Sequence, residues 1–369
     1  MSIKSKTWLL DSQKGYTRLM CFENKHCLYC DVDLPSPPPH YGAIYEGKVT
    51  KILQTANLAF LDLGERLEAV LSLPERHFPK PQEGETLLVQ ITREPSPSQG
   101  KLAMASRAIE VPWGPFVWTP GEPGLRFSKK LTVEVRKNLE SLLTPLMSED
   151  DGLLVRSHVS AFSSEELLAC HTKIVSRSFF EILKQIQHDH FIKKLLTLTT
   201  PKDTIKVDSL ALYSDFTKAI ASHPYAPILL HEKEGTFDEN LEEAWEKMFE
   251  IHVPISGGGE IIIEKTHAFY AIDINTGQTN QPAHAFLKKA IDTAFEEIRK
   301  RDLGGIILID IPFPPKSQGD LLGYVKREAQ RDLNPPKIHG ITSLGILEIT
   351  RKHRSLPPLE KIVNFEKSI

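Results

Sequence analysis

The most constraining feature of the sequence is a strand–helix–strand pattern in its last third. The apolar run at residues 270–272 ends at Asp273, and the run at residues 304–309 ends at Asp310. Residues 283–301 lie between them and space their apolar side chains as one face of a helix does, at Leu287, Ile291, Ala294 and Ile298. Two strands joined by a helix can lie side by side in one sheet. We therefore expect a mixed α/β fold in which both aspartates end neighbouring strands.

Two carboxylates at neighbouring strand ends would share one cleft and repel each other. A divalent cation between them removes this repulsion, and Mg²⁺ takes a few hard oxygen ligands while keeping several waters. Asn275, two residues beyond Asp273, lies on the same face of its strand and offers an amide. The alternative is that such aspartates start turns or cap helices. Spacing alone leaves both interpretations open.

A second organised region, residues 41–107, consists of short strand-like runs separated by glycines. The runs lie at residues 45–49, 59–63, 68–72, 86–91 and 101–105. Five strands in so short a segment predict a small barrel of the OB type. Such barrels bind single-stranded nucleic acid by stacking bases on aromatic side chains beside a basic groove.

Other segments give weaker indications of structure. Alternation over residues 6–34 predicts a strand hairpin, and the prolines at 35–39 mark a boundary. Ser163 and Glu166 form a capping-box pattern that opens a helix running through Ile186. We expect short strands over residues 205–230 and a helix over residues 237–249.

The chain of 369 residues is long enough for two or three domains. Its net charge of −3 gives no overall basic footprint, so any nucleic-acid surface must be local. No apolar run approaches the roughly 20 residues that span a bilayer, and the N-terminus is unlike a secretory signal, so we expect a cytoplasmic protein. Cys27 and Cys30 have metal-like spacing without a second pair, which favours buried free thiols.

Residues 271–277, AIDINTG, followed by residues 301–310, RDLGGIILID, resemble the catalytic region of the ribonuclease E/G family. The resemblance is collinear from about residue 8 to about residue 357. It implies a Mg²⁺-dependent endoribonuclease that holds the metal with Asp273 and Asp310, supported by the Asn275 amide. It also implies that activated water cleaves single-stranded RNA to leave a 5′-phosphate and a 3′-hydroxyl.

The resemblance further implies a domain plan. Residues 1–40 and 205–255 would form a ribonuclease-H-like subdomain into which an S1-type OB barrel, residues 41–107, is inserted. Residues 108–204 would form a subdomain that senses the 5′ end of RNA. Residues 256–369 would form a deoxyribonuclease-I-like catalytic subdomain.

Several RNA-contacting residues follow from the same resemblance. Phe60 would stack on a base and Lys101 would contact phosphate, whereas Val70 replaces the second aromatic residue of the family. The alternative for Phe60 is a place in the barrel core. Lys129 and Lys130 would contact the RNA backbone.

The pocket for a 5′-monophosphate would use Arg156 and Ser157 together with the backbone at Val117. An arginine suits this role because its planar guanidinium can bind phosphate through two parallel hydrogen bonds. Taken without the family, an Arg-Ser pair would indicate no more than a surface ion pair.

The sequence also departs from the family. No cysteine follows Cys170, so the zinc-linked dimer of the family is not expected, although other oligomers remain possible. A proline-rich stretch at 311–316 stands where the family has a second acidic residue. Two rival functions remain open: a non-catalytic relative that binds RNA through the barrel, and a Mg²⁺ phosphoesterase acting on DNA or a nucleotide.

Overall fold

The structure is a computed structural model of the chain. It describes residues 5–13, 15–24, 26–34, 40–75, 78–95, 100–120, 122–147, 152–176, 190–221, 225–312, 318–352 and 356–366. The chain forms two compact units: Met1–Thr7 with Ser36–His231, and Trp8–Pro35 with Glu232–Ile369. Within the described ranges no helix is both long and apolar enough to cross a membrane.

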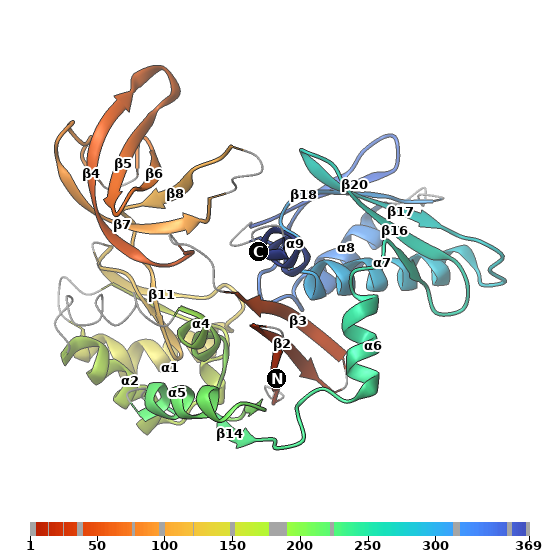
Figure 1. The fold of residues 1–369 in the computed structure, drawn as a ribbon, viewed down its shortest axis with the longest axis horizontal. Coiled ribbons are helices and arrows are strands. Elements are labelled where there is room, and N and C mark those ends of the chain that lie inside the picture. The colour runs from red at the N-terminus through yellow and green to blue at the C-terminus, as the bar shows by residue number, and fades with distance from the viewer. Residues whose placement is uncertain are drawn as a thin grey trace. The chain divides into compact units, whose positions relative to one another are not determined.

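The first unit contains a closed five-stranded barrel (Figure 1). Its strands are β4 (Ile44–Leu53), β5 (Leu58–Gly64), β6 (Leu67–Ser72), β7 (Thr86–Arg93) and β8 (Ala103–Ser106). They are joined in the order β4-β5-β6-β8-β7. Alternate residues fill the interior, as the period of two requires. The predicted strands are confirmed, and the barrel is compatible with an OB fold.

A four-stranded sheet follows in the same unit, in the order β11-β12-β10-β9. Its strands are β9 (Val111–Trp113), β10 (Phe116–Trp118), β11 (Gly124–Phe127) and β12 (Gly152–Val155). The apolar faces of α1 (Val133–Leu143) and α2 (Ser164–Ser176) share one core with this sheet.

The capping box that opens α2 is confirmed. The backbone N–H of Glu166 donates to Ser163 Oγ at 3.2 Å, and the backbone N–H of Ser163 donates to Glu166 Oε2 at 2.7 Å. The predicted continuation of this helix to Ile186 falls partly on residues 177–189, which lie outside the described residues. α4 (His190–Leu198) begins after that gap.

The prediction of strands alone over residues 205–230 is wrong. β13 (Thr204–Val207) and β14 (Ile228–His231) form a parallel pair, but α5 (Leu210–Ala221) lies between them. Phe216 is the one fully buried residue of that helix, so its sequence shows little of the apolar stripe that identifies a helix.

In the second unit, β1 (Thr7–Gln13), β2 (Tyr16–Glu23) and β3 (His26–Asp33) are successive neighbours. α6 (Glu239–Lys247) packs Trp245 against this region, within the helix predicted over residues 237–249.

The four cysteines lie within the described residues, are buried and form no disulfide, as predicted for Cys27 and Cys30. The sulfur atoms of Cys27 and Cys30 lie 3.4 Å apart, and burial raises the pKa of the Cys30 thiol. A thiol held in the neutral form by burial is a poor metal ligand and a poor nucleophile.

The six-stranded sheet of the second unit has the order β15-β16-β17-β18-β20-β19. Its strands are β15 (His252–Pro254), β16 (Glu260–Lys265), β17 (Phe269–Asn275), β18 (Gly305–Asp310), β19 (Lys337–Ile341) and β20 (Ile346–Arg351). Only the contact between β17 and β18 is parallel in this sheet; the other strand pairs are antiparallel.

Two helices, α7 (Ala283–Lys300) and α8 (Gln318–Ala329), lie along one side of this sheet and share its core (Figure 1). β17, α7 and β18 form the predicted strand–helix–strand unit. β19 and the last helix, α9 (Pro358–Glu366), were not predicted.

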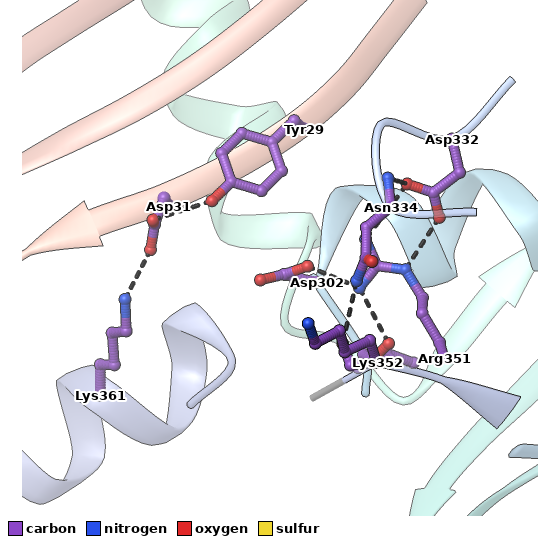
Figure 2. Close-up of polar contacts among 9 residues, drawn as sticks. Tyr29, Asp31, Asp302, Asp332, Asn334, Arg351, Lys352 and Lys361 are labelled. Carbon is purple, nitrogen blue, oxygen red and sulfur yellow. Dashed lines mark hydrogen bonds and ion pairs between the residues drawn. The ribbon is translucent and has the colours of Figure 1, made fainter. Parts of the chain in front are cut away.

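A buried arginine fastens three parts of this unit together (Figure 2). The guanidinium of Arg351, at the end of β20, donates to Asp302 at 2.5 Å and to Asp332 at 2.8 Å. It also donates to the carbonyl of Leu303 at 3.0 Å. Burial alone would lower the pKa of Arg351, but the charges of the two aspartates raise it above its ordinary value. The arginine therefore stays charged.

Candidate active site

The structure brings Asp273 and Asp310 together. In the parallel register of β17 and β18, Ile272 pairs with Ile309, and the two aspartates occupy the next position on each strand. Neighbouring strands are about 4.8 Å apart, which allows both carboxylates to reach one small ion. Both side chains are exposed. The predicted placement on adjacent strands is thus confirmed, whereas the metal-binding role stays a prediction.

Alternation along the strands explains why both aspartates face outward. Ile272, Ile274 and Ile309 are buried in the core that includes α7. Because successive strand residues point to opposite faces, Asp273, Asn275 and Asp310 occupy the face away from α7 and α8. Asn275 is exposed on that face and lies opposite Glu260 of β16.

Apolar residues flank the aspartate pair on both sides. Ile262 of β16 lies opposite Asp273, and Ile346 of β20 lies opposite Asp310. Among the residues that the structure describes, no hydrogen bond or ion pair occupies either carboxylate. Two carboxylates side by side repel each other, and a divalent cation held between them would offset this repulsion.

Mg²⁺ fits this donor set. It is usually bound through one or two carboxylates and keeps several waters, so it does not need a closed cage of protein ligands. The described ranges contain no group of three or more His, Cys, Asp and Glu residues placed to hold a metal. Such a group is what a structural zinc site would need.

A glycine loop supports the end of β17 that carries Asn275. Gly259 has φ +83°, and a Cβ atom there would lie 2.6 Å from the backbone oxygen of Asn275. The side chain of Gln281 donates to the carbonyl of Gly257 at 2.8 Å and closes the loop. Glycine is therefore required at 259, both for its backbone conformation and for the close approach to Asn275.

On the barrel, Phe60 is half-buried and does not belong to the cluster that fills the interior. The alternative interpretation of Phe60 as a core residue is therefore wrong. Strand register places Lys51 on one side of Phe60 and Val70 on the other, and Met104 lies beyond Val70. This row, which we call the barrel strip, ends at Arg93, the partner of Met104 on β7; its member Val70 is buried, at 8% exposed. Apolar side chains thus lie between two cations.

Lys101 is exposed, two residues before β8. Its position just before the start of that strand places it on the barrel, and its contact with phosphate stays a prediction.

The predicted 5′-phosphate residues gather where β12 ends. The backbone N–H of Arg156 donates to the carbonyl of Pro115 at 2.8 Å, and its guanidinium donates to the carbonyl of Gly114 at 3.3 Å. Ser157 is exposed, and Val117 on β10 lies opposite Leu154. Both the backbone and the guanidinium of Arg156 are therefore held in place.

The turn with Lys129 and Lys130 reaches the same strand end, because the backbone N–H of Ser128 donates to Val155 at 2.8 Å. Both lysines are exposed. The structure thus brings this basic turn and Arg156 to one end of β12.

His158, which sequence reasoning missed, lies beside Arg156. Its Nε2 is 3.3 Å from the carbonyl of Gly114. Burial, reinforced by the charge of Arg156, lowers the pKa of His158 to about 3. The imidazole is therefore neutral at neutral pH and adds no positive charge beside Arg156. A lone histidine next to an arginine gave no signal of this in the sequence.

These features define a class of protein: a multi-part α/β protein that joins a small nucleic-acid-type barrel to a sheet with an exposed pair of carboxylates. The model of the family described as "Ribonuclease E/G family" matches residues 115–354, and the chain belongs to this family.

Curated relatives are similar in sequence to this chain over most of its length. Ribonuclease G of Haemophilus influenzae is 26% identical over 368 residues, covering 87% of this chain and 74% of that protein. Ribonuclease G of Escherichia coli K12 is 25% identical, covering 84% and 72%. Ribonuclease E of the same strain is 24% identical and covers 93% of this chain but 36% of its own length.

Proposed function

We propose that the chain is a Mg²⁺-dependent endoribonuclease that hydrolyses single-stranded RNA internally, leaving a 5′-phosphate and a 3′-hydroxyl. The observation that carries the proposal is the register of Asp273 beside Asp310 on an exposed sheet face. Membership of the ribonuclease E/G family supports the reaction class. We propose the cytoplasm, where RNA is processed, as its place of action.

In this proposal Asp273 and Asp310 hold the metal and fix its position against the phosphate. Mg²⁺, when bound, offsets the charge of the phosphate and activates water for in-line attack. Asn275 orients Asp273 or donates its amide N–H to a phosphate oxygen. Ile262 and Ile346 place apolar side chains on either side of the pair.

Separate surfaces of the first unit would hold the RNA. Phe60 offers a ring for base stacking, and the cations of the barrel strip and Lys101 offer contacts to phosphates. A chain with no overall positive charge needs such local cations to bind a polyanion.

Arg156 and Ser157, with the backbone at Val117, would bind a terminal 5′-monophosphate, and Lys129 and Lys130 would bind the adjoining backbone. The anchoring of Arg156 through Gly114 and Pro115 supports this role, because a preorganised guanidinium loses less entropy on binding.

The test uses purified chain and an A/U-rich single-stranded RNA with either a 5′-monophosphate or a 5′-hydroxyl, in Mg²⁺ or in chelator. We expect internal cuts in Mg²⁺ alone, faster on the monophosphorylated RNA. Asp273→Asn and Asp310→Asn should each lower kcat by at least about 100-fold while RNA affinity is kept. Asp215→Asn, an exposed carboxylate on α5, is the matched control and should cut normally.

RNA binding without any Mg²⁺-dependent cutting would instead assign the chain to the non-catalytic binding class. Equal cutting of DNA and RNA oligomers would assign it to a broader phosphoesterase class. Either result refutes the proposal.

A further inference from the structure

The sheet face that carries the aspartate pair continues into a second row of side chains. In strand register, Glu264 lies opposite Ala271, Ala271 beside Leu308, and Leu308 opposite Glu348. Ala271 and Leu308 each precede an aspartate of the pair by two residues, so this row lies on the same face. Along a strand, two residues span about 6.6 Å. The second row is therefore next to the proposed site of cleavage.

The centre of this row is apolar although it faces outward. Ala271 and Leu308 are half-buried rather than buried, and Ile306, the next outward residue of β18, is 47% exposed. The outward face of a sheet that is covered on its other side is ordinarily polar. A flat apolar surface beside a catalytic centre matches the face of a nucleobase, which is itself planar and poorly hydrated.

Carboxylates close both ends of the row. Glu264 and Glu348 are exposed, and within the described part of the chain neither makes a side-chain hydrogen bond or an ion pair. Glu260 on the same face differs, since its Oε2 lies 3.1 Å from Nδ1 of His252. The two free carboxylates repel phosphates, so the RNA backbone is excluded from this row and a base can enter it.

A carboxylate only accepts hydrogen bonds, so it discriminates among base edges. Adenine and cytosine present a donating amino group at the position where uracil presents its O4 carbonyl. Of the two carboxylates, Glu348 lies opposite the larger apolar residue, Leu308. A ring resting on Leu308 would turn its edge toward Glu348.

We propose that Leu308 and Ala271 form a platform for the nucleobase next to the cleaved phosphate, and that Glu348 accepts a hydrogen bond from its exocyclic amino group. The inference rests on the proposed function and adds a substrate preference to it: adenosine and cytidine, whose amino group lies at that position, are cut at better than uridine. Glu348 is a specificity-determining residue here, and the chemistry remains with the aspartate pair.

The experiment removes one amino group from the substrate and its acceptor from the protein. Short single-stranded RNAs with one cut site carry adenosine or purine riboside, which lacks the 6-amino group, at each nucleotide flanking the cut. We expect the wild-type kcat/KM to favour adenosine by about tenfold at one of these positions. Glu348→Ala should reduce the preference to about unity.

Graded variants and a matched control sharpen the test. Glu348→Gln keeps a neutral acceptor and should give an intermediate preference, because a charge-assisted hydrogen bond is roughly twice as strong as a neutral one. Leu308→Ala should lower kcat/KM for both substrates. Glu264→Ala, at the other end of the row, should leave the adenosine preference unchanged.

The inference is overturned if the wild type cuts both substrates equally, if Glu348→Ala keeps the preference, or if Glu264→Ala abolishes it. Mg²⁺-dependent cutting without any such preference refutes this inference and leaves the proposed function standing. Absence of cutting by the wild type refutes both together.

Discussion

Replacement of Arg351 by methionine should strongly destabilise the second unit. The arginine side chain is 2% exposed, and its partners Asp332 and Asp302 are 3% and 12% exposed. Methionine keeps most of the apolar stem but leaves two carboxylates without their cation. Removing one partner of a buried ion pair costs about 3–5 kcal/mol, because a charge stays buried and uncompensated.

The expected loss of melting temperature, and a triple variant that tests its cause, both follow from this ion-pair network. For a unit of this size, each kcal/mol corresponds to about 2–4 °C, so the unit should melt about 6–20 °C lower. If the cost lies in the unpaired carboxylates, then adding Asp302→Asn and Asp332→Asn to Arg351→Met should recover at least half of it. A well-packed neutral replacement of a buried ion pair is often close to neutral in stability.

Urea unfolding followed by tryptophan fluorescence and by circular dichroism would measure these differences. The control is Lys247→Met, which breaks the exposed pair with Glu243 on α6 and should leave the stability essentially unchanged. The reasoning fails if Arg351→Met costs less than about 1 kcal/mol, or if the triple variant is no more stable than the single one.

Three further predictions follow. Gly259→Ala should lower RNA cleavage by about tenfold or more, because its Cβ would displace Asn275 from its place; Gly235→Ala has the same kind of backbone strain in open space and should cleave normally in the same assay. The pKa of His158 is about 3 in the folded state and near its ordinary value of 6.5 in the unfolded state. Between these two pH values the unfolded state therefore binds one more proton than the folded state. The free energy of unfolding should fall as the pH drops from about 6.5 toward 3. The loss should reach about 2 kcal/mol at pH 5 in urea titrations, and His158→Gln should remove this pH dependence. Phe60→Ala should weaken RNA binding by about 1–3 kcal/mol in fluorescence anisotropy; unchanged affinity would exclude this strip as the RNA surface.

The parts of the fold that sequence predicted well have strong local periodicity. Buried and outward residues alternate along the barrel strands, and α7 carries a continuous apolar stripe. The local sequence of each element is therefore enough to predict its secondary structure. α5 and β19 lack such a pattern. The first buries one residue fully, and the second is a short strand of five residues at the sheet edge.

The candidate site also has residues whose placement could be predicted from the sequence and residues whose placement could not. Asp273 and Asp310 could be placed together because a strand–helix–strand unit puts its strands side by side by a general rule. The approach of Glu348 to Leu308 depends on an antiparallel register between residues forty positions apart, which no local pattern encodes. His158 escaped notice for a related reason, since its unusual pKa comes from burial beside Arg156 and Gly114.

The parallel contact between β17 and β18 has a consequence for how such a protein can be controlled. The two aspartates stand on the backbone of adjacent strands that are tied by α7, so no loop movement can part them. A slip of one residue between the strands would turn one carboxylate into the core, and the apolar residues beneath forbid that. Control would then have to act on the delivery of RNA to a centre that is assembled as soon as the chain has folded.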